Sequence, residues 1–115
     1  MPYDKNALSG NTTMLILKLL EDKDMYGYQI IDELLKKSGE SFNLKTGTLY
    51  PILHSLEKDG MVTSYDEVAG IQRVRRYYRL TNKGKLLLFK KESEWKSYVT
   101  VVNRLMNGGE CSAPI

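Results

Sequence analysis

The sequence predicts a mainly helical α+β fold in which three helices precede a two-stranded hairpin and one long helix follows it. Apolar residues recur at the spacing of one buried helical stripe at Leu49, Ile52, Leu53 and Leu56. Residues 72–80 alternate as a strand does, and apolar residues from Trp95 onward recur at helical spacing again. At 115 residues the chain accommodates one domain with a modest core, and a second folded domain does not fit.

The first helix is expected to run from about Leu8 to Leu20. Its apolar residues lie almost all the way round the helix: Leu8, Met14, Leu15, Ile16, Leu17, Leu19 and Leu20. A helix with so little polar surface must be covered on two sides, and the domain core covers one of them. We expect a dimer partner or a ligand to cover the other; a central core helix in a monomer is the alternative.

The second helix is expected to begin after residues 25–27 and to end at residues 38–40. Its inward face is formed by Ile30, Ile31, Leu34 and Leu35. Phe42 and Leu44 are then expected to pack beneath the third helix.

The third helix falls within residues 46–60, where Thr46 is expected to cap its start and Gly60 to follow its end. Pro51 lies within the first two turns, where we expect most backbone donors to lack an intrahelical partner, so the missing N–H costs little. Gly47 allows the backbone to approach a partner surface closely. These features suit a helix end that is pressed against a groove.

Residues 61–67 are expected to form the first strand of the hairpin, residues 68–71 its tip and residues 72–80 the returning strand. Strand alternation turns Tyr78 and Leu80 toward the core. The hairpin therefore closes the domain before the last helix begins.

The returning strand is basic, because it contains Arg73, Arg75 and Arg76. No carboxylate occurs from Val68 through Lys91, although the chain has 14 acidic and 17 basic residues and a net charge of only +3. The positive charge is therefore local, and a phosphate backbone attracts a local basic field. A basic strand beside a helix with an exposed polar face is typical of a wing, so the sequence predicts a winged helix-turn-helix that binds double-stranded DNA.

Three segments, in this order and spacing, resemble the PadR family of transcriptional regulators. They are Tyr-Gly-Tyr-Gln-Ile at residues 26–30, Gly-Thr-Leu-Tyr-Pro-Ile-Leu with Leu-Glu-Lys-Asp-Gly within residues 47–60, and Arg-Arg-Tyr-Tyr-Arg-Leu-Thr at residues 75–81 followed by Gly84. The resemblance covers most of the chain and implies a winged-helix dimer.

The chain then divides into residues 1–80, a winged-helix DNA-binding domain that includes the first helix, and residues 81–107, a C-terminal dimerisation helix of the same compact unit. Thr81 is expected to cap this last helix, which runs to about Met106. Residues 108–115 show no apolar periodicity and are expected to form a disordered tail.

A dimer of this kind places two recognition helices in successive major grooves, so the operator should be an inverted repeat. The third helix is expected to meet base edges and thymine methyls, and the wing arginines to meet phosphates or a narrow minor groove. Tyr28 and Gln29 at the start of the second helix are expected to reach a phosphate. The alternative, for one of the two, is an exposed polar position without a DNA contact. The candidate DNA-binding residues are Tyr28, Gln29, Lys45, Thr46, Thr48, Tyr50, Pro51, His54, Arg73, Arg75, Arg76 and Lys83.

The second half of the last helix carries a continuous apolar stripe formed by Trp95, Tyr98, Val99, Val102, Leu105 and Met106. A stripe of this length beyond the wing has no domain surface left to cover it. We expect it to pack against the partner subunit as coiled-coil helices do, and folding back on its own domain is the alternative.

The position of Trp95 relative to the segment Leu80-Thr81 is similar to that of the tryptophan in multidrug-sensing PadR regulators with short carboxyl-terminal regions. That resemblance implies a pore at the dimer axis in which two tryptophans hold a flat aromatic compound, and its lining would be Thr13, Met14, Leu17, Lys18, Trp95 and Val99. Packing of Trp95 in the dimer interface without a ligand is the alternative. Val99 stands where a carboxylate would favour cationic drugs and Lys18 adds positive charge, so a neutral or anionic aromatic is expected.

Catalysis and metal binding are not expected. His54 is the only histidine and Cys111 the only cysteine, and no nucleophile with an orienting partner accompanies either of them. We therefore expect neither an enzyme nor a protein that depends on a metal or cofactor. A single cysteine allows no intrachain disulfide, which agrees with a reducing cytoplasm. Cys111 is expected to be a free thiol on a frayed end, and a redox sensor is the alternative.

No membrane segment or signal sequence is expected. The longest apolar run, residues 14–20, is interrupted by Lys18 and is far shorter than the ~20 residues that a membrane span needs. We therefore expect a cytoplasmic, sequence-specific regulator, a homodimeric repressor on an inverted-repeat operator that an aromatic small molecule releases. The alternative is a winged-helix protein-protein interaction module whose basic wing meets an acidic protein surface.

Overall fold

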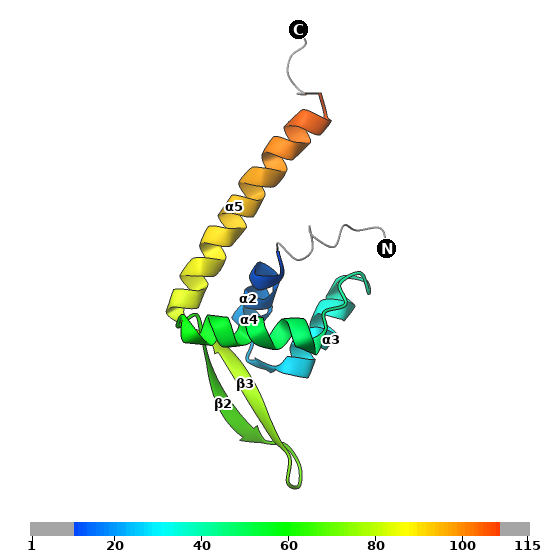
Figure 1. Cartoon of the computed structure of the whole chain (residues 1–115). Coiled ribbons are helices and arrows are strands. Elements are labelled where there is room, and N and C mark those ends of the chain that lie inside the picture. The colour runs from blue at the N-terminus through cyan, green and yellow to red at the C-terminus, as the bar shows by residue number, and fades with distance from the viewer. Residues whose placement is uncertain (1–10, 109–115) are drawn as a thin grey trace.

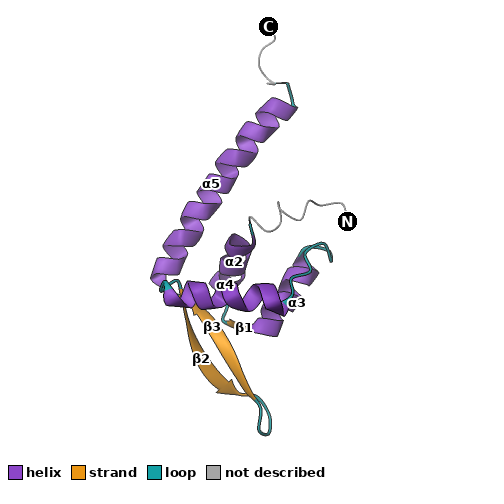
Figure 2. Ribbon diagram, in the orientation of Figure 1, coloured by secondary structure: helices purple, strands orange, loops and turns teal. Residues whose placement is uncertain are grey.

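The computed structural model describes residues 11–108 and confirms a mainly helical α+β fold with a wing and a long C-terminal helix (Figure 1, Figure 2). In chain order its elements are α2 (Thr12–Asp22), β1 (Met25–Tyr26), α3 (Gly27–Lys37), α4 (Thr46–Lys58), β2 (Val62–Val68), β3 (Val74–Leu80) and α5 (Asn82–Met106). The wing and α5 extend from the helical unit in opposite directions (Figure 1). Leu8 and Cys111, for which we made predictions, lie outside the described residues.

Helix α2 forms the centre of the core. It packs against α3, β3 and α5, and Ile16, Leu17, Leu19 and Leu20 are buried. Met14 and Leu15 are half-buried against the same core. The protomer thus covers most of the apolar surface of α2 itself, which removes much of the argument for a partner that we drew from this helix.

The sheet has three strands in the order β1-β3-β2, all antiparallel. Strands β2 and β3 confirm the predicted hairpin to within one or two residues at each end. The third strand, β1, was missed because a two-residue strand shows no alternation. Met25 pairs with Tyr78 in this strand, and its side chain has no exposed surface.

The core confirms the predicted stripes. Leu49, Leu53 and Leu56 of α4 are buried, and Ile52 packs at the edge of the same cluster. Tyr78 and Leu80 of β3 face this cluster, as do Phe42 and Leu44 before α4. A hydrogen bond of 2.6 Å from the Ser64 hydroxyl to a Glu57 carboxylate oxygen further joins α4 to β2. Helix α4 is thus fixed against the base of the wing.

Two predictions about the start of α4 are wrong. The backbone is still extended at Lys45, which is the N-cap residue, so Thr46 is the first helical residue and its side chain makes no cap hydrogen bond. Counting from Thr46, Pro51 is the sixth residue of the helix and lies beyond the donors that lack intrahelical partners. Pro51 therefore cannot donate to the carbonyl of Gly47, as a helical residue at this position would.

The predicted cap of α5 is confirmed. The Gly84 amide donates a 3.0 Å hydrogen bond to Thr81 Oγ1. The Thr81 hydroxyl lies 2.7 Å from the carbonyl oxygen of Gly60 and 2.9 Å from that of Met61, and it can donate to either. Thr81 therefore joins the end of the α4 region, the wing and α5 at one point.

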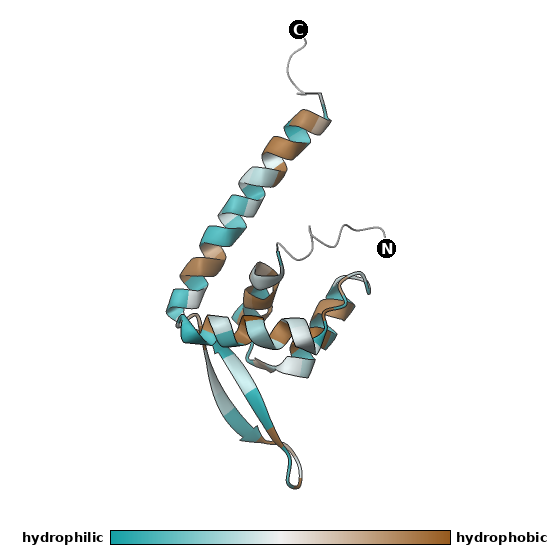
Figure 3. Cartoon of the chain, in the orientation of Figure 1, coloured by the Kyte–Doolittle hydropathy of each residue, from teal (hydrophilic) through white to brown (hydrophobic). Residues whose placement is uncertain are grey.

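The distal half of α5 stands away from its own domain (Figure 3). The exposed fraction is 44% for Trp95, 67% for Tyr98 and 75% for Leu105, and it is 77% for Met106. Val99 and Val102 are half-exposed. Within residues 11–108 the stripe therefore does not fold back on its own domain and has no partner surface. Among the described residues, no helix is both long enough and apolar enough to cross a membrane.

Candidate nucleic-acid interface

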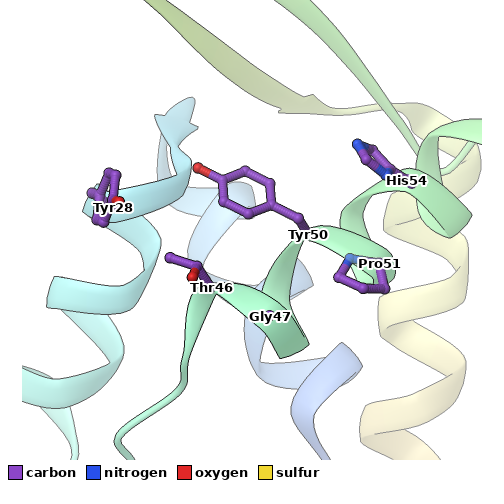
Figure 4. Close-up of a pocket in the computed structure, with 6 residues that line it drawn as sticks. All are labelled: Tyr28, Thr46, Gly47, Tyr50, Pro51 and His54. Carbon is purple, nitrogen blue, oxygen red and sulfur yellow. The ribbon is translucent and has the colours of Figure 1, made fainter.

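The first turns of α4 and the start of α3 form a shallow groove, here called the helix groove (Figure 4). Figure 4 shows the Tyr50 ring extending from α4 toward the start of α3, where Tyr28 lies. The residues that line the helix groove are Tyr28, Thr46, Gly47, Tyr50, Pro51 and His54. Tyr28, Pro51 and His54 are exposed, so their polar and apolar atoms are available to a ligand surface.

A second groove adjoins the first and extends onto the wing. This wing groove has a volume of about 500 Å³ and is lined by Tyr26, Gly27, Tyr28, Tyr50, Arg73, Val74, Arg75 and Arg76. Tyr28 and Tyr50 belong to both grooves, which makes them one continuous surface. The structure therefore brings together most of the predicted DNA-binding residues, although they come from three separate segments of the chain.

Four candidate residues line neither groove. Lys45 and Thr48 are exposed at the start of α4, and Gln29 is half-buried on α3. Lys83 lies beyond the other end of α4, where its side chain is within 3.9 Å of the place that a Cβ would take on Gly60. Lys83 is thus separated from the other candidates and can contribute only as a more distant charge.

Tyr50 is less exposed than we expected, since it is half-buried and packs against the core. Its ring lies so close to Gly27 that a Cβ on this glycine would overlap the tyrosine hydroxyl and come within 2.7 Å of Cζ. Gly27 therefore makes room for Tyr50. The sequence analysis missed this contact, because nothing in the spacing of the two residues along the chain indicates it.

Cross-strand pairing places acidic residues beside the wing arginines. Asp66 is paired with Arg76 and Glu67 with Arg75 in the β2–β3 register. One Asp66 carboxylate oxygen lies 3.5 Å from the Arg76 Nε, and both side chains are more than half exposed. Such exposed pairs contribute little stability, but they do offset charge. The wing is thus less positive than the carboxylate-free run from Val68 to Lys91 had suggested.

Arg75 is held by an aromatic ring. Its guanidinium carbon lies 4.4 Å from the centroid of the Tyr26 ring, a distance at which the ring face attracts a cation. Arg75 is half-buried, whereas Arg73 and Arg76 are exposed. Of the three arginines, Arg75 therefore has the most defined position.

The predicted effector residues come from α2 and from α5, two helices that pack against each other. Leu17 has no exposed surface, so a ligand would reach it only if the core rearranged, and its prediction as a ligand residue does not fit the structure. Thr13 and Met14 are half-buried, as is Val99. Trp95 is exposed.

Lys18 of α2 is not a free positive charge. Its ammonium lies 3.0 Å from a carboxylate oxygen of Glu21 and 3.3 Å from one of Glu92 on α5. Hydrogen bonds to Glu21 and then Glu92 raise the pKa of Lys18 above its ordinary value. The argument that Lys18 favours an anionic effector is therefore wrong, because two carboxylates offset its charge.

Comparison with known proteins decides the family. The transcriptional regulator PadR-like family matches residues 16–90, which contain the helix-turn-helix, the wing and the first part of α5. The chain belongs to this family. Membership makes it a DNA-binding transcriptional regulator and not an enzyme.

Solved structures of transcriptional regulators share the fold. A transcriptional regulator from Clostridium thermocellum superposes with a TM-score of 0.82 at 32% identity, over 89% of this chain and 96% of that one. A PadR family regulator from Clostridium difficile gives a TM-score of 0.71 at 35% identity, over 84% and 98% of the two chains. The negative transcriptional regulator PadR of Bacillus subtilis is 30% identical over 61% of this chain, but the alignment covers only 38% of that regulator.

Proposed function

We propose that this PadR regulator is a cytoplasmic homodimeric repressor that binds an inverted-repeat operator. The observation that carries the proposal is the continuity of the helix groove with the wing groove, which joins the exposed start of α4 to the wing arginines. A helix and a basic hairpin joined in this way can follow a major groove and the adjacent phosphates together.

The two parts of this surface have different roles in the proposal. Thr46, Pro51 and His54 approach base edges or thymine methyls from α4, with Thr48 and Tyr50 beside them. Arg73, Arg75 and Arg76 meet phosphates or the minor groove, and Tyr28 with Gln29 meets the backbone at the start of α3. Lys45 and Lys83 add charge.

The dimer is formed through the distal half of α5. Large apolar side chains that are 44–77% exposed, such as Trp95 and Met106, favour burial against a second copy of the helix. A twofold axis between two such helices would repeat the DNA-binding surface once per DNA turn. Repression agrees with the negative regulation named for the Bacillus subtilis relative.

An aromatic effector is proposed to bind near Trp95, Val99, Met14 and Thr13 at the dimer axis. Ligand binding releases the operator only if it favours a dimer whose α4 helices no longer match the half-site spacing. Because Lys18 is paired with Glu21 and Glu92, the structure gives no preference for an anionic effector. Neutral, anionic and cationic aromatic compounds should therefore be compared by the quenching of Trp95 fluorescence.

The test is binding of the purified protein to the promoter DNA of its own gene, measured by fluorescence anisotropy across a salt series with a scrambled duplex as control. Tight binding that prefers the promoter at moderate salt supports the proposal. Weak and equal binding to both duplexes, together with salt-sensitive binding to an acidic protein surface, would favour a protein-interaction module instead.

A further inference from the structure

The outer face of the three-stranded sheet carries one row of tyrosines. The pairing of β1 with β3 and of β3 with β2 aligns Tyr26, Tyr77 and Tyr65 across all three strands, here called the tyrosine row. The Tyr26 and Tyr77 rings meet edge to face with centroids 5.4 Å apart. The Tyr77 and Tyr65 rings stack with centroids 5.7 Å apart. These rings join the wing to the start of the helix-turn-helix.

Two arginines of β3 lie over the two ends of the tyrosine row. Arg75 lies over the Tyr26 ring, and Arg79 lies over the Tyr65 ring at 5.2 Å. Arg75 also lines the wing groove, whereas Arg79 does not. The row therefore connects a residue of the proposed DNA-binding surface to a residue at the root of the wing.

Asp24 fixes the root end of this row. Its Oδ2 atom accepts a 2.6 Å hydrogen bond from the Tyr65 hydroxyl and a 3.1 Å hydrogen bond from Arg79 Nε, and the Arg79 Nη2 lies 3.0 Å away. The Asp24 side chain is 25% exposed, so water screens these bonds only in part. Asp24 lies between the end of α2 at Asp22 and the start of β1 at Met25, so it belongs to neither wing strand.

Beyond this root the wing is a two-stranded ribbon. Val68 and Val74 at its far end are 75% and 61% exposed, so no core packing holds it there. A two-stranded ribbon twists readily on its own, and its direction depends on the contacts at its base. The bonds of Asp24 to a residue of β2 and a residue of β3 are such contacts.

We propose that Asp24 is a positioning residue that sets the direction of the wing relative to α4 and, through the tyrosine row, the place of Arg75 at the DNA. The inference rests on the proposed DNA-binding function. Asp24 is a carboxylate near a DNA-binding surface, so charge and positioning predict opposite effects of its removal on DNA affinity. Charge alone predicts that its removal strengthens DNA binding, whereas positioning predicts that its removal weakens DNA binding.

The experiment compares Asp24→Ala with Asp66→Ala. Both variants remove one carboxylate, from beside Arg79 or from beside Arg76. Within residues 11–108, however, the Asp66 carboxylate makes only the 3.5 Å contact to an exposed arginine. We expect Asp24→Ala to weaken promoter binding roughly five- to tenfold and to lower the salt slope by about one ion. Asp66→Ala is expected to bind as wild type or up to about threefold more tightly. Tyr65→Phe changes no charge, and we expect it to weaken binding in the same direction as Asp24→Ala.

A second readout does not depend on DNA. Amide hydrogen exchange in β2 and β3 of the free protein should become faster in Asp24→Ala and Tyr65→Phe, but not in Asp66→Ala, while α4 stays protected. Equal or tighter promoter binding by Asp24→Ala, or unchanged exchange in its wing, would overturn the positioning role. If the wild-type protein shows no promoter preference, the proposed function fails, and the exchange data still decide whether Asp24 holds the wing.

Discussion

The contact between Gly27 and Tyr50 gives the most exacting prediction of the site geometry. A Cβ at Gly27 would overlap the Tyr50 hydroxyl and would lie 2.7 Å from Cζ and 3.0 Å from Cε1. Ordinary contacts of this kind are near 3.5–4.0 Å, so Gly27→Ala must move the end of the ring by about 1 Å. The ring is half-buried and lines both grooves, so its displacement changes their shape.

Two opposing contributions determine the size of the effect. Gly27 does not require a positive φ, so alanine at this position should stabilise the protein by roughly 0.4–1 kcal/mol through the unfolded chain. Displacing the packed ring should cost about 1–3 kcal/mol. We expect Gly27→Ala to be destabilising by about 1 kcal/mol in the wild type and stabilising by about 0.5 kcal/mol once Tyr50 is alanine.

The assay is a double-mutant cycle of Gly27→Ala and Tyr50→Ala, measured by urea unfolding, with promoter binding of each variant by anisotropy. Gly47→Ala is the matched control, since Gly47 is an exposed helical glycine and a Cβ there would meet nothing within 4 Å among the described residues, apart from its chain neighbours and its own helix backbone. Its effect on stability should be the same with or without Tyr50. A coupling energy below about 0.5 kcal/mol between Gly27 and Tyr50 would refute the contact.

Three further predictions concern the helix cap, the dimer and DNA reading. Thr81→Val should lower the free energy of unfolding by about 1.5–3 kcal/mol, because it removes both the cap and the hydroxyl's own hydrogen bond. Thr81→Ser keeps the hydroxyl and should stay within about 0.5 kcal/mol of wild type. Equal urea midpoints for both variants would count against the cap. Leu105→Asp should dissociate the dimer in analytical ultracentrifugation. Thr100→Asp, on another face of α5, should leave the dimer intact. A monomeric wild-type protein would refute the interface. Arg75→Ala should weaken binding to promoter and scrambled DNA alike, with a smaller salt slope. Tyr50→Ala should weaken binding to the promoter more than binding to scrambled DNA. Equal losses of binding to both duplexes would remove the specific role of Tyr50.

Much of the fold was predictable because its signals are local. The stripe at Leu49, Leu53 and Leu56 and the alternation that ends at Tyr78 and Leu80 each lie within one element, and burial confirms them. The cap by Thr81 is likewise a property of a few consecutive residues. In contrast, the predicted start of α4 was wrong by one residue, because the N-cap is Lys45, a residue type that gives no capping signal in the sequence.

The details of the site were not predictable because they depend on pairing between distant segments. Asp24 meets Tyr65 and Arg79 across separations of 41 and 55 residues, beside a strand β1 that is only two residues long. Glu67 was outside the carboxylate-free run that drew attention to the wing, yet strand pairing places it opposite Arg75. A count of charges along the chain cannot detect such neighbours.

The most direct test of the central claim is hydroxyl-radical footprinting of the wild-type protein on its own promoter. A homodimer that reads an inverted repeat through α4 should protect two half-sites related by twofold symmetry, with centres about 10 base pairs apart, and Arg75→Ala should weaken both protections together. Protection that is absent, uniform along the duplex or confined to a single half-site would contradict a sequence-specific dimeric regulator of this geometry.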